Sequence, residues 1–136
     1  MQKLIIEGKH PLSGNVRVSG SKNAALPILA ATLLTDSPCT IHNVPQLRDT
    51  RTMCELLKSL GKDVDFIGNT VRVTSRGNLQ PVAHYDLVST MRGSFCVLGP
   101  LLAKLRTAKV SLPGGCVIGV RPVDLHLKGL RSLGVT

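Results

Sequence analysis

The sequence predicts an α/β (α+β) fold in which a unit of helices and strands is repeated. Three observations support this prediction. Apolar residues recur at helical spacing in some segments and form short runs in others, which indicates helices that alternate with strands. Residues typical of turns, mainly Gly, Pro and Asn, separate these segments. The two halves of the 136-residue chain also carry similar motifs in the same order.

The first predicted helix follows two short predicted strands. The strands are Leu4 to Ile6 and Val16 to Val18, and the turn-rich segment "GKHPLSGN" joins them. Apolar residues from Leu26 to Leu34 then recur at helical spacing. Pro27 is compatible with a helix only in its first turn. This places three polar residues at the start of the helix: Ser21, Lys22 and Asn23.

A strand, a helix and a hairpin follow. Cys39 to Ile41 is predicted to be a strand, and Asp49 is a suitable N-cap for the next helix. Gly61 is placed to end that helix. Val64 to Ile67 and Val71 to Val73 flank Gly-Asn, which is a strong signal for a two-residue hairpin turn. The apolar face of the helix consists of Met53, Leu56, Leu57 and Leu60.

The second half repeats this order. Apolar spacing predicts helices over Met91 to Leu102 and over Val123 to Leu133, the second closed by Gly134, with a strand at Lys109 to Leu112 between them. "LLKSLGKDV" matches "GLRSLGVT", and Lys22 and Arg92 lie at the same offset from a Val-Ser pair. We therefore predict two repeat units of about 70 residues, 1–75 and 76–136.

The second predicted unit lacks the hairpin of the first. The chain stops two residues after its second Ser-Leu-Gly, so the sequence looks truncated within a repeat. A missing hairpin would leave apolar helix faces uncovered. We expect this chain alone to be poorly soluble or only partly folded.

Composition narrows the classes of function. The content of 43% hydrophobic and 18% charged residues is typical of a globular protein. No apolar run approaches the roughly 20 residues of a membrane span, and the N-terminus does not resemble a secretion signal, so a cytoplasmic protein is expected. The net charge of +9 indicates an anionic partner: nucleic acid, a membrane surface or a phosphorylated metabolite. Two Phe, one Tyr and no Trp leave few rings to stack on bases.

The four cysteines do not predict a metal site. Cys39, Cys54, Cys96 and Cys116 are widely spaced, with no Cys-x-x-Cys pair and no His at ligand spacing. Neither a metal nor a cofactor is expected. The first three lie in strand-like or helix-like contexts, and we interpret them as packing residues.

"SGSKNA" is a candidate anion site. It does not match the phosphate loop, because the spacing between the glycines is too long and Ser21 precedes Lys22. Lys22 and Asn23 nevertheless stand beside exposed N–H groups at a helix start, where phosphate or carboxylate groups bind. The alternative is a solvated lysine before a helix.

Two arginines in the second half are further candidates. Arg92 matches Lys22 in the repeat, so both cations could face a common cleft; the alternative is a solvated helical arginine. Arg121 precedes Pro122, which suits the first position of a helix. The N–H groups of Val123, Asp124 and Leu125 would then lack intrahelical partners, and a guanidinium beside them can hold a diphosphate or a carboxylate. Asp124 can instead cap its own helix.

Cys116 lies in the segment "SLPGGCVIGVRPVDLH". It is either a small apolar residue in a turn or a reactive thiol. Gly114 and Gly115 give the loop freedom to move, and Arg121 with the helix start supplies a positive field that favours the thiolate. A general acid must keep its proton until it is needed. A mobile loop that brings the thiol to the cation only with substrate bound would meet both requirements.

These motifs resemble one family. "SGSKNAALPILAATLL", "YDLVSTMRGSFCVLGPLLA" and above all "SLPGGCVIGVRPVDLHLKGL" are similar to the amino-terminal part of the bacterial UDP-N-acetylglucosamine enolpyruvyl transferases, within the EPSP synthase-like enolpyruvyl transferases. The resemblance covers essentially the whole chain. It implies two domains built from β-α-β-α-β-β units as inside-out α/β barrels, with the second domain absent here.

The resemblance also implies a reaction and a site. Phosphoenolpyruvate would give its enolpyruvyl group to the 3-hydroxyl of UDP-N-acetylglucosamine, with release of phosphate, as the first committed step of peptidoglycan synthesis. Lys22 and Asn23 would hold phosphoenolpyruvate. Cys116 would protonate it, can form a covalent adduct with it and would be alkylated by fosfomycin. The UDP-sugar would be bound by Arg92, Arg121, Pro122, Val123, Asp124 and Leu125. Further residues come from the missing part, so we expect this chain alone to be inactive.

Two other functions stay open on the sequence. One is the shikimate 3-phosphate enolpyruvyl transferase, which shares the architecture but lacks the cysteine loop. The other, from a different class, is a small basic nucleic-acid-binding module. Charge spread along a repeat and the scarcity of aromatic residues argue against this module.

Overall fold

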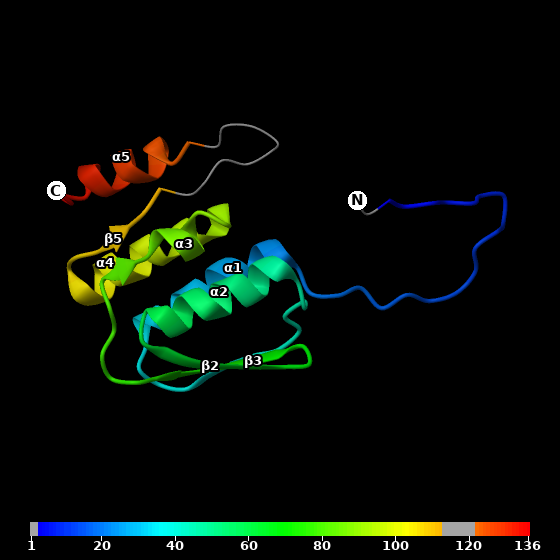
Figure 1. The fold of residues 1–136 in the computed structure, drawn as a ribbon, viewed down its shortest axis with the longest axis horizontal. Coiled ribbons are helices and arrows are strands. Elements are labelled where there is room, and N and C mark those ends of the chain that lie inside the picture. Colours follow the sequence, from blue (N-terminus) through cyan, green and yellow to red (C-terminus); the bar gives the residue numbers. More distant parts are fainter. Residues whose placement is uncertain (1–2, 113–121) are drawn as a thin grey trace.

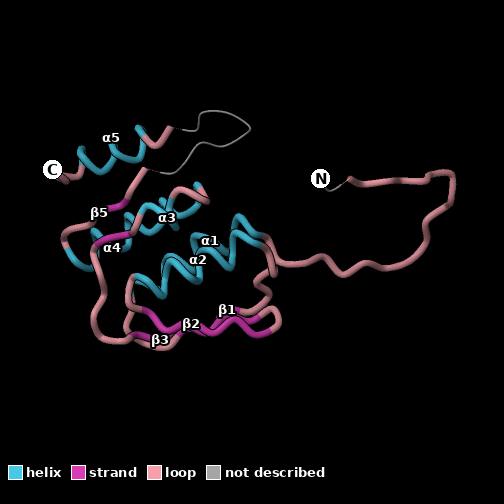
Figure 2. Tube along the Cα trace, viewed as in Figure 1, coloured by secondary structure: helices cyan, strands magenta, loops and turns pink. Residues whose placement is uncertain are grey.

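The structure is a computed structural model and describes residues 3–112 and 122–136. Figure 1 shows stacked layers: a sheet, then α1 and α2, then α3 and α4, and α5 outermost. Figure 2 shows the same path by secondary structure. The elements are α1 (Lys22–Ala31), β1 (Cys39–Ile41), α2 (Arg48–Ser59), β2 (Lys62–Ile67), β3 (Thr70–Ser75), β4 (Val82–Ala83), α3 (Tyr85–Val88), α4 (Leu98–Leu105), β5 (Lys109–Val110) and α5 (Asp124–Ser132), with 3₁₀ turns at Thr32–Leu34 (η1) and Arg92–Val97 (η2).

The larger sheet is antiparallel with strand order β1-β3-β2. The predicted strand Cys39–Ile41 and the predicted hairpin are confirmed. Gly68 takes a φ of +54° at the turn, a conformation that glycine adopts at little cost. Val71 and Val73 are at most 2% exposed, because their side of the pleat faces the helices.

α1 begins at Lys22, as predicted, and the Ser21 hydroxyl accepts a hydrogen bond from the Ala24 N–H at 3.3 Å. The expectation that Pro27 lies in the first turn is wrong, since it is the sixth residue of the helix. Proline has no N–H, so the Asn23 carbonyl lacks its usual donor from residue 27. Burial of Leu26, Leu29 and Ala30 stabilises the helix despite this loss.

α2 is confirmed, but its cap is not the predicted one. Asp49 is the second residue of the helix rather than its N-cap. The Thr50 hydroxyl instead accepts from the Leu47 N–H at 3.1 Å and donates to the Pro45 carbonyl at 2.7 Å. At the other end Gly61 has a φ of +100°, and its N–H donates to the Lys58 carbonyl, so the predicted stop is confirmed.

The second half follows the predicted order with different details. One continuous helix from Met91 to Leu102 is wrong: η2 covers Arg92–Val97, and α4 begins only at Leu98. Pro100 explains the break, because it cannot donate to the Cys96 carbonyl but suits the first turn of α4. The predicted strand to Leu112 is shorter, since β5 pairs in parallel with β4 only at Lys109–Val110. α5 is confirmed as a helix, and Gly134 with a φ of +88° follows its end. The expected place of Pro122 at the first helical position is wrong, because α5 begins at Asp124 with Val123 as its N-cap.

The two strands predicted near the N-terminus are not formed. The described residues before α1 contain no helix or strand, and this segment extends away from the layers (Figure 1). No described segment is paired with it, and a strand requires such a partner for its backbone groups. Its large apolar side chains are therefore 74–96% exposed: Leu4, Ile5, Ile6, Leu12, Val16 and Val18.

The main core lies between α1, α2 and the sheet. Leu29, Met53 and Leu57 are fully buried there. A smaller cluster of Phe95, Leu98 and Val123 joins η2, α4 and the start of α5. Within the described ranges, no helix is long and apolar enough to cross a bilayer.

Candidate functional site

Lys22 is held by an ion pair that the sequence did not predict. Its Nζ lies 2.7 Å from Oδ2 of Asp49 in α2, and the two side chains are 41% and 33% exposed. The pair brings the starts of α1 and α2 together. Asn23 follows on the exposed side of the same first turn.

A close backbone approach fixes the segment that leads into α1. A Cβ at Gly20 would lie only 1.7 Å from the carbonyl oxygen of Asn43, which has a φ of +59° in the loop after β1. Only glycine allows this contact. Gly20 therefore determines how Lys22 and Asn23 sit against the β1–α2 loop.

Arg92 is the first residue of η2, and its side chain reaches the start of α5. Its Nη2 donates to the Pro122 carbonyl at 3.3 Å. Gly93 packs on α1, since a Cβ there would lie 2.7 Å from Cδ1 of Leu26. Lys22 and Arg92 thus begin neighbouring segments, α1 and η2, and Figure 1 shows α1, α2 and α5 all starting from the same side of the molecule.

The start of α5 rests on η2. Val123 is 8% exposed and packs in the cluster with Phe95 and Leu98. The His126 ring meets Phe95 edge to face, with centroids 5.8 Å apart. Pro122, Asp124 and Leu125 remain exposed beside the Arg92 contact.

Cys116 and Arg121 lie outside the described residues. Of the other cysteines, Cys54 is buried, and burial raises the pKa of its thiol to about 11, so its packing role is confirmed. Cys39 is half-buried and packs against the core. The prediction for Cys96 is wrong: this residue is exposed on η2, whose buried residues are Ser94, Phe95 and Val97. Burial of its thiol still raises its pKa, and nearby Arg92 opposes the rise.

This gathering of helix starts can hold anions. Lys22 and Arg92 supply positive charge, and the first N–H groups of a helix carry a partial positive charge and lack intrahelical acceptors. Together such groups bind phosphate or carboxylate. In the part of the chain that is described, no cluster of three or more His, Cys, Asp or Glu residues could hold a metal ion.

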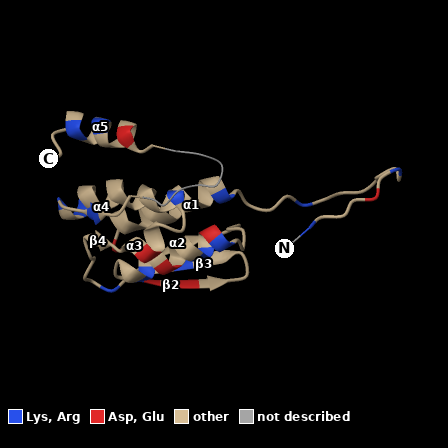
Figure 3. Cartoon of the chain, turned by 45° about the horizontal axis from the view of Figure 1, so that its top comes forward, with Lys and Arg blue, Asp and Glu red and all other residues tan. Residues whose placement is uncertain are grey.

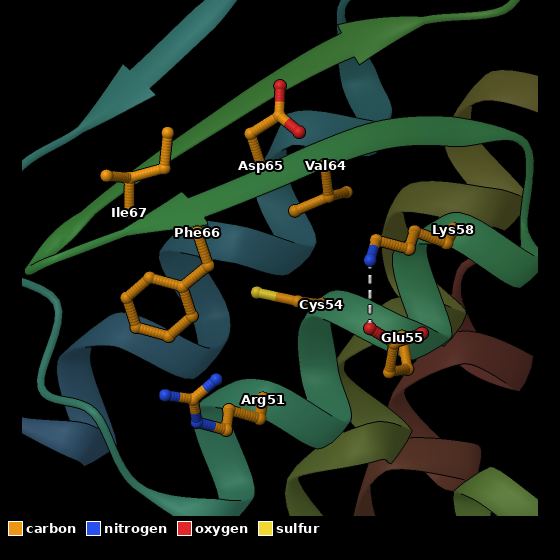
Figure 4. Close-up of a pocket in the computed structure, with 8 residues that line it drawn as sticks. All are labelled: Arg51, Cys54, Glu55, Lys58, Val64, Asp65, Phe66 and Ile67. Carbon is orange, nitrogen blue, oxygen red and sulfur yellow. Dashed lines mark hydrogen bonds and ion pairs between the residues drawn. The ribbon is translucent and has the colours of Figure 1, made fainter.

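A pocket of about 520 Å³ lies elsewhere, between α2 and β2 (Figure 4). Arg51 lies over the Phe66 ring at 5.5 Å from its centroid, and Lys58 bonds Glu55 at 2.9 Å. Its other lining residues are Cys54, Val64, Asp65 and Ile67. It contains none of the predicted site residues.

A second polar cluster joins the sheet to α4. Lys62 is 2% exposed, and its Nζ donates to the Thr35 carbonyl at 2.6 Å. Asp36 next to it pairs with Lys104 of α4 at 2.6 Å. Burial lowers the pKa of Lys62, while the bond from Lys104 lowers the pKa of Asp36. Figure 3 shows basic residues spread over many elements.

The contacts of Gly20 and Asp49 are not predictable from the sequence. The only sequence feature that indicates the Gly20 contact is a glycine just before the polar start of a helix. The sequence predicts Asp49 as a helix cap, but its partner Lys22 lies in another helix, and no local pattern indicates that pairing.

Comparisons with known proteins identify the family of this chain. The family model described as EPSP synthase (3-phosphoshikimate 1-carboxyvinyltransferase) matches residues 6–136. Relatives named UDP-N-acetylglucosamine 1-carboxyvinyltransferase are 58% identical over 98% of the chain in Methylacidiphilum infernorum and in Lawsonia intracellularis, and 57% identical over the whole chain in Desulfovibrio desulfuricans. The chain spans 32% of the length of each of these relatives.

A solved structure is similar as well. The crystal structure of the enolpyruvyl transferase NikO from Streptomyces tendae matches 69% of this chain, and 22% of its own chain, with a TM-score of 0.62 and 28% identity. The predicted α/β fold class and the resemblance are thereby confirmed. The chain belongs to the EPSP synthase family of enolpyruvyl transferases.

Proposed function

We propose that this chain is the amino-terminal part of an enzyme that transfers the enolpyruvyl group of phosphoenolpyruvate to the 3-hydroxyl of UDP-N-acetylglucosamine and releases phosphate. The observation that carries the proposal is the 55–58% identity, over 98% or more of the chain, to relatives with this activity in their name. In this proposal residues 1–75 and 76–136 are two repeat units of one partial domain. The reaction is the first committed step of peptidoglycan synthesis, in the cytoplasm.

The charges of the site suit these substrates. Phosphoenolpyruvate and the UDP-sugar are both anions, and Lys22 and Arg92 begin neighbouring helical segments. Lys22 and Asn23 would bind phosphoenolpyruvate. Arg92, Pro122, Val123, Asp124 and Leu125 would bind the UDP-sugar together with Arg121. The contact between Arg92 and Pro122 supports this grouping.

The chemistry requires an acid at carbon. Addition of the sugar hydroxyl to the double bond of phosphoenolpyruvate, an enol phosphate, needs a proton on the methylene carbon and stabilisation of the charge that develops. Loss of phosphate and of a proton from the resulting methyl group then restores the double bond. Cys116 would donate that proton, can form a covalent adduct with phosphoenolpyruvate and would be the thiol that fosfomycin alkylates. The residues that complete the site would come from the two thirds of the relatives' length that this chain does not span.

The test joins this chain to the remaining two thirds of the Methylacidiphilum infernorum relative. We expect the joined protein to release phosphate from phosphoenolpyruvate with UDP-N-acetylglucosamine and not with shikimate 3-phosphate. Consumption of shikimate 3-phosphate instead would assign the sibling activity. A Cys116→Ser variant should lose fosfomycin labelling, and unchanged labelling would remove Cys116 from the proposed role.

A further inference from the structure

We infer that Asp49 is a positioning residue for the candidate anion site: its carboxylate holds the Lys22 ammonium at the start of α1, with donors left for an anionic ligand. This inference rests on the proposed function for the identity of the ligand, phosphoenolpyruvate. It rests on the 2.7 Å ion pair for the positioning itself.

Lys22 needs a partner where it stands. It is the first residue of α1, and a cation is disfavoured at the positive end of a helix. The first turn of α1 contains no acidic residue that could compensate. The compensating charge comes from the neighbouring helix, through Asp49.

Asp49 is free to play this part because another residue caps α2. Thr50 accepts from the Leu47 N–H and donates to the Pro45 carbonyl, so the N-terminal turn of α2 does not require the Asp49 side chain. As an acid in the first turn, Asp49 is itself stabilised by the dipole of α2. Its carboxylate can therefore face α1.

The ion pair leaves the Lys22 ammonium group able to bind an anionic ligand. An ammonium group has three N–H donors, and the bond to Asp49 occupies one. Both side chains are partly exposed, so an anion can approach. A long lysine side chain loses much conformational freedom when a ligand fixes it. A lysine that is already held loses less on binding, which strengthens binding.

The ion pair itself is tested by NMR, without ligand, of the protein in which this chain is joined to the remaining two thirds of the Methylacidiphilum infernorum relative. The Nζ ammonium group of Lys22 should give an NMR signal typical of a side chain with restricted motion. Asp49→Asn should abolish this signal, and Asp49→Glu should partly restore it. Asp63→Asn is the matched control, since it removes another ion pair of an aspartate, with Arg76 on the sheet. Lys22 signals that are unchanged in Asp49→Asn would overturn the inference.

Ligand binding is tested by titration of phosphoenolpyruvate, with the amides of Lys22, Asn23 and Ala24 as reporters. We expect Asp49→Asn to weaken binding about three- to tenfold, while Asp63→Asn leaves it unchanged. Tighter binding by Asp49→Asn would also overturn the inference, because Asp49 would then compete with the ligand. If the unaltered joined protein does not bind phosphoenolpyruvate but Lys22 still depends on Asp49, the positioning stands and the proposed ligand fails.

Discussion

Helices α2 and α5 carry related sequences but are packed very differently. Both end in Ser-Leu-Gly, and both were predicted from the same apolar spacing. α2 buries Met53, Leu56 and Leu57 completely, whereas no residue of α5 is buried. The hairpin β2–β3 follows α2 and covers it, and α5 lies on a small cluster at the outside of the molecule. A repeated pattern therefore predicts which segments are helical, but their burial depends on what covers them.

The largest expected effect comes from shortening a leucine in each helix. Leu57→Ala should lower the opening free energy of α2 by about 2–5 kcal/mol, because it leaves a cavity in a closed core. Leu130→Ala in α5 should cost about 1 kcal/mol or less, since Leu130 is only partly buried. Amide hydrogen exchange measures each helix separately.

Similar losses in the two helices would contradict the contrast between them. Leu133→Ala serves as the control, because Leu133 is 83% exposed and its change should be near zero.

The next effect concerns the contact that leads into α1. Gly20→Ala places a methyl group on the Asn43 carbonyl, so the backbone must shift, at a cost of about 1–3 kcal/mol. The hydrogen-exchange rates of the α1 amides should rise, and the rates of the α5 amides should change little. Gly8→Ala is the matched control, since nothing lies within 4 Å of a Cβ there. Equal effects of the two substitutions would show that the Gly20 contact is unimportant.

A smaller effect concerns the cluster that joins the sheet to α4. Burial lowers the pKa of Lys62, so the unfolded state binds more protons at pH values between the folded and unfolded pKa. Stability should therefore rise with pH in this alkaline range. Lys62→Met should remove this rise, as measured by denaturant unfolding at a series of pH values. An unchanged pH dependence in the variant would mean that Lys62 is not buried in solution.

The smallest effect leaves the fold intact and compares two thiols. The pKa of Cys54 is raised by burial to about 11, and Cys54 is 3% exposed, whereas Cys96 is exposed. Iodoacetamide at pH 8 should label Cys96 at least about tenfold faster than Cys54, because only an accessible thiolate reacts. Mass spectrometry of the proteolytic peptides measures the labelling rate of each cysteine. Faster labelling of Cys54 would indicate that the α2 core opens readily.

Local patterns explain what the sequence could predict. Helical spacing located α1, α2 and α5, and Gly-Asn located the hairpin. The prediction of two strands before α1 is wrong, because strand formation depends on a pairing partner that local sequence does not indicate. The break before α4 could have been read from Pro100.

The site shows the same division. The sequence indicated the cations Lys22 and Arg92 and their places at helical starts, which the structure confirms. Their partners, Asp49 and the Pro122 carbonyl, are far apart in the chain and come together only through packing. Polar residue types at a helix start can be recognised in a sequence, but their long-range contacts cannot.

The strand order β1-β3-β2 has a consequence for synthesis on the ribosome. The central strand β3 is the last of the three strands to leave the exit tunnel. β1 therefore has no strand to pair with while α2 and β2 are synthesised. The hairpin contacts are local and can form as soon as residue 75 emerges, whereas β1 must then join across a long loop. Until that moment the apolar side of α2 has no sheet to cover it, and this nascent chain is then open to chaperone binding and to aggregation.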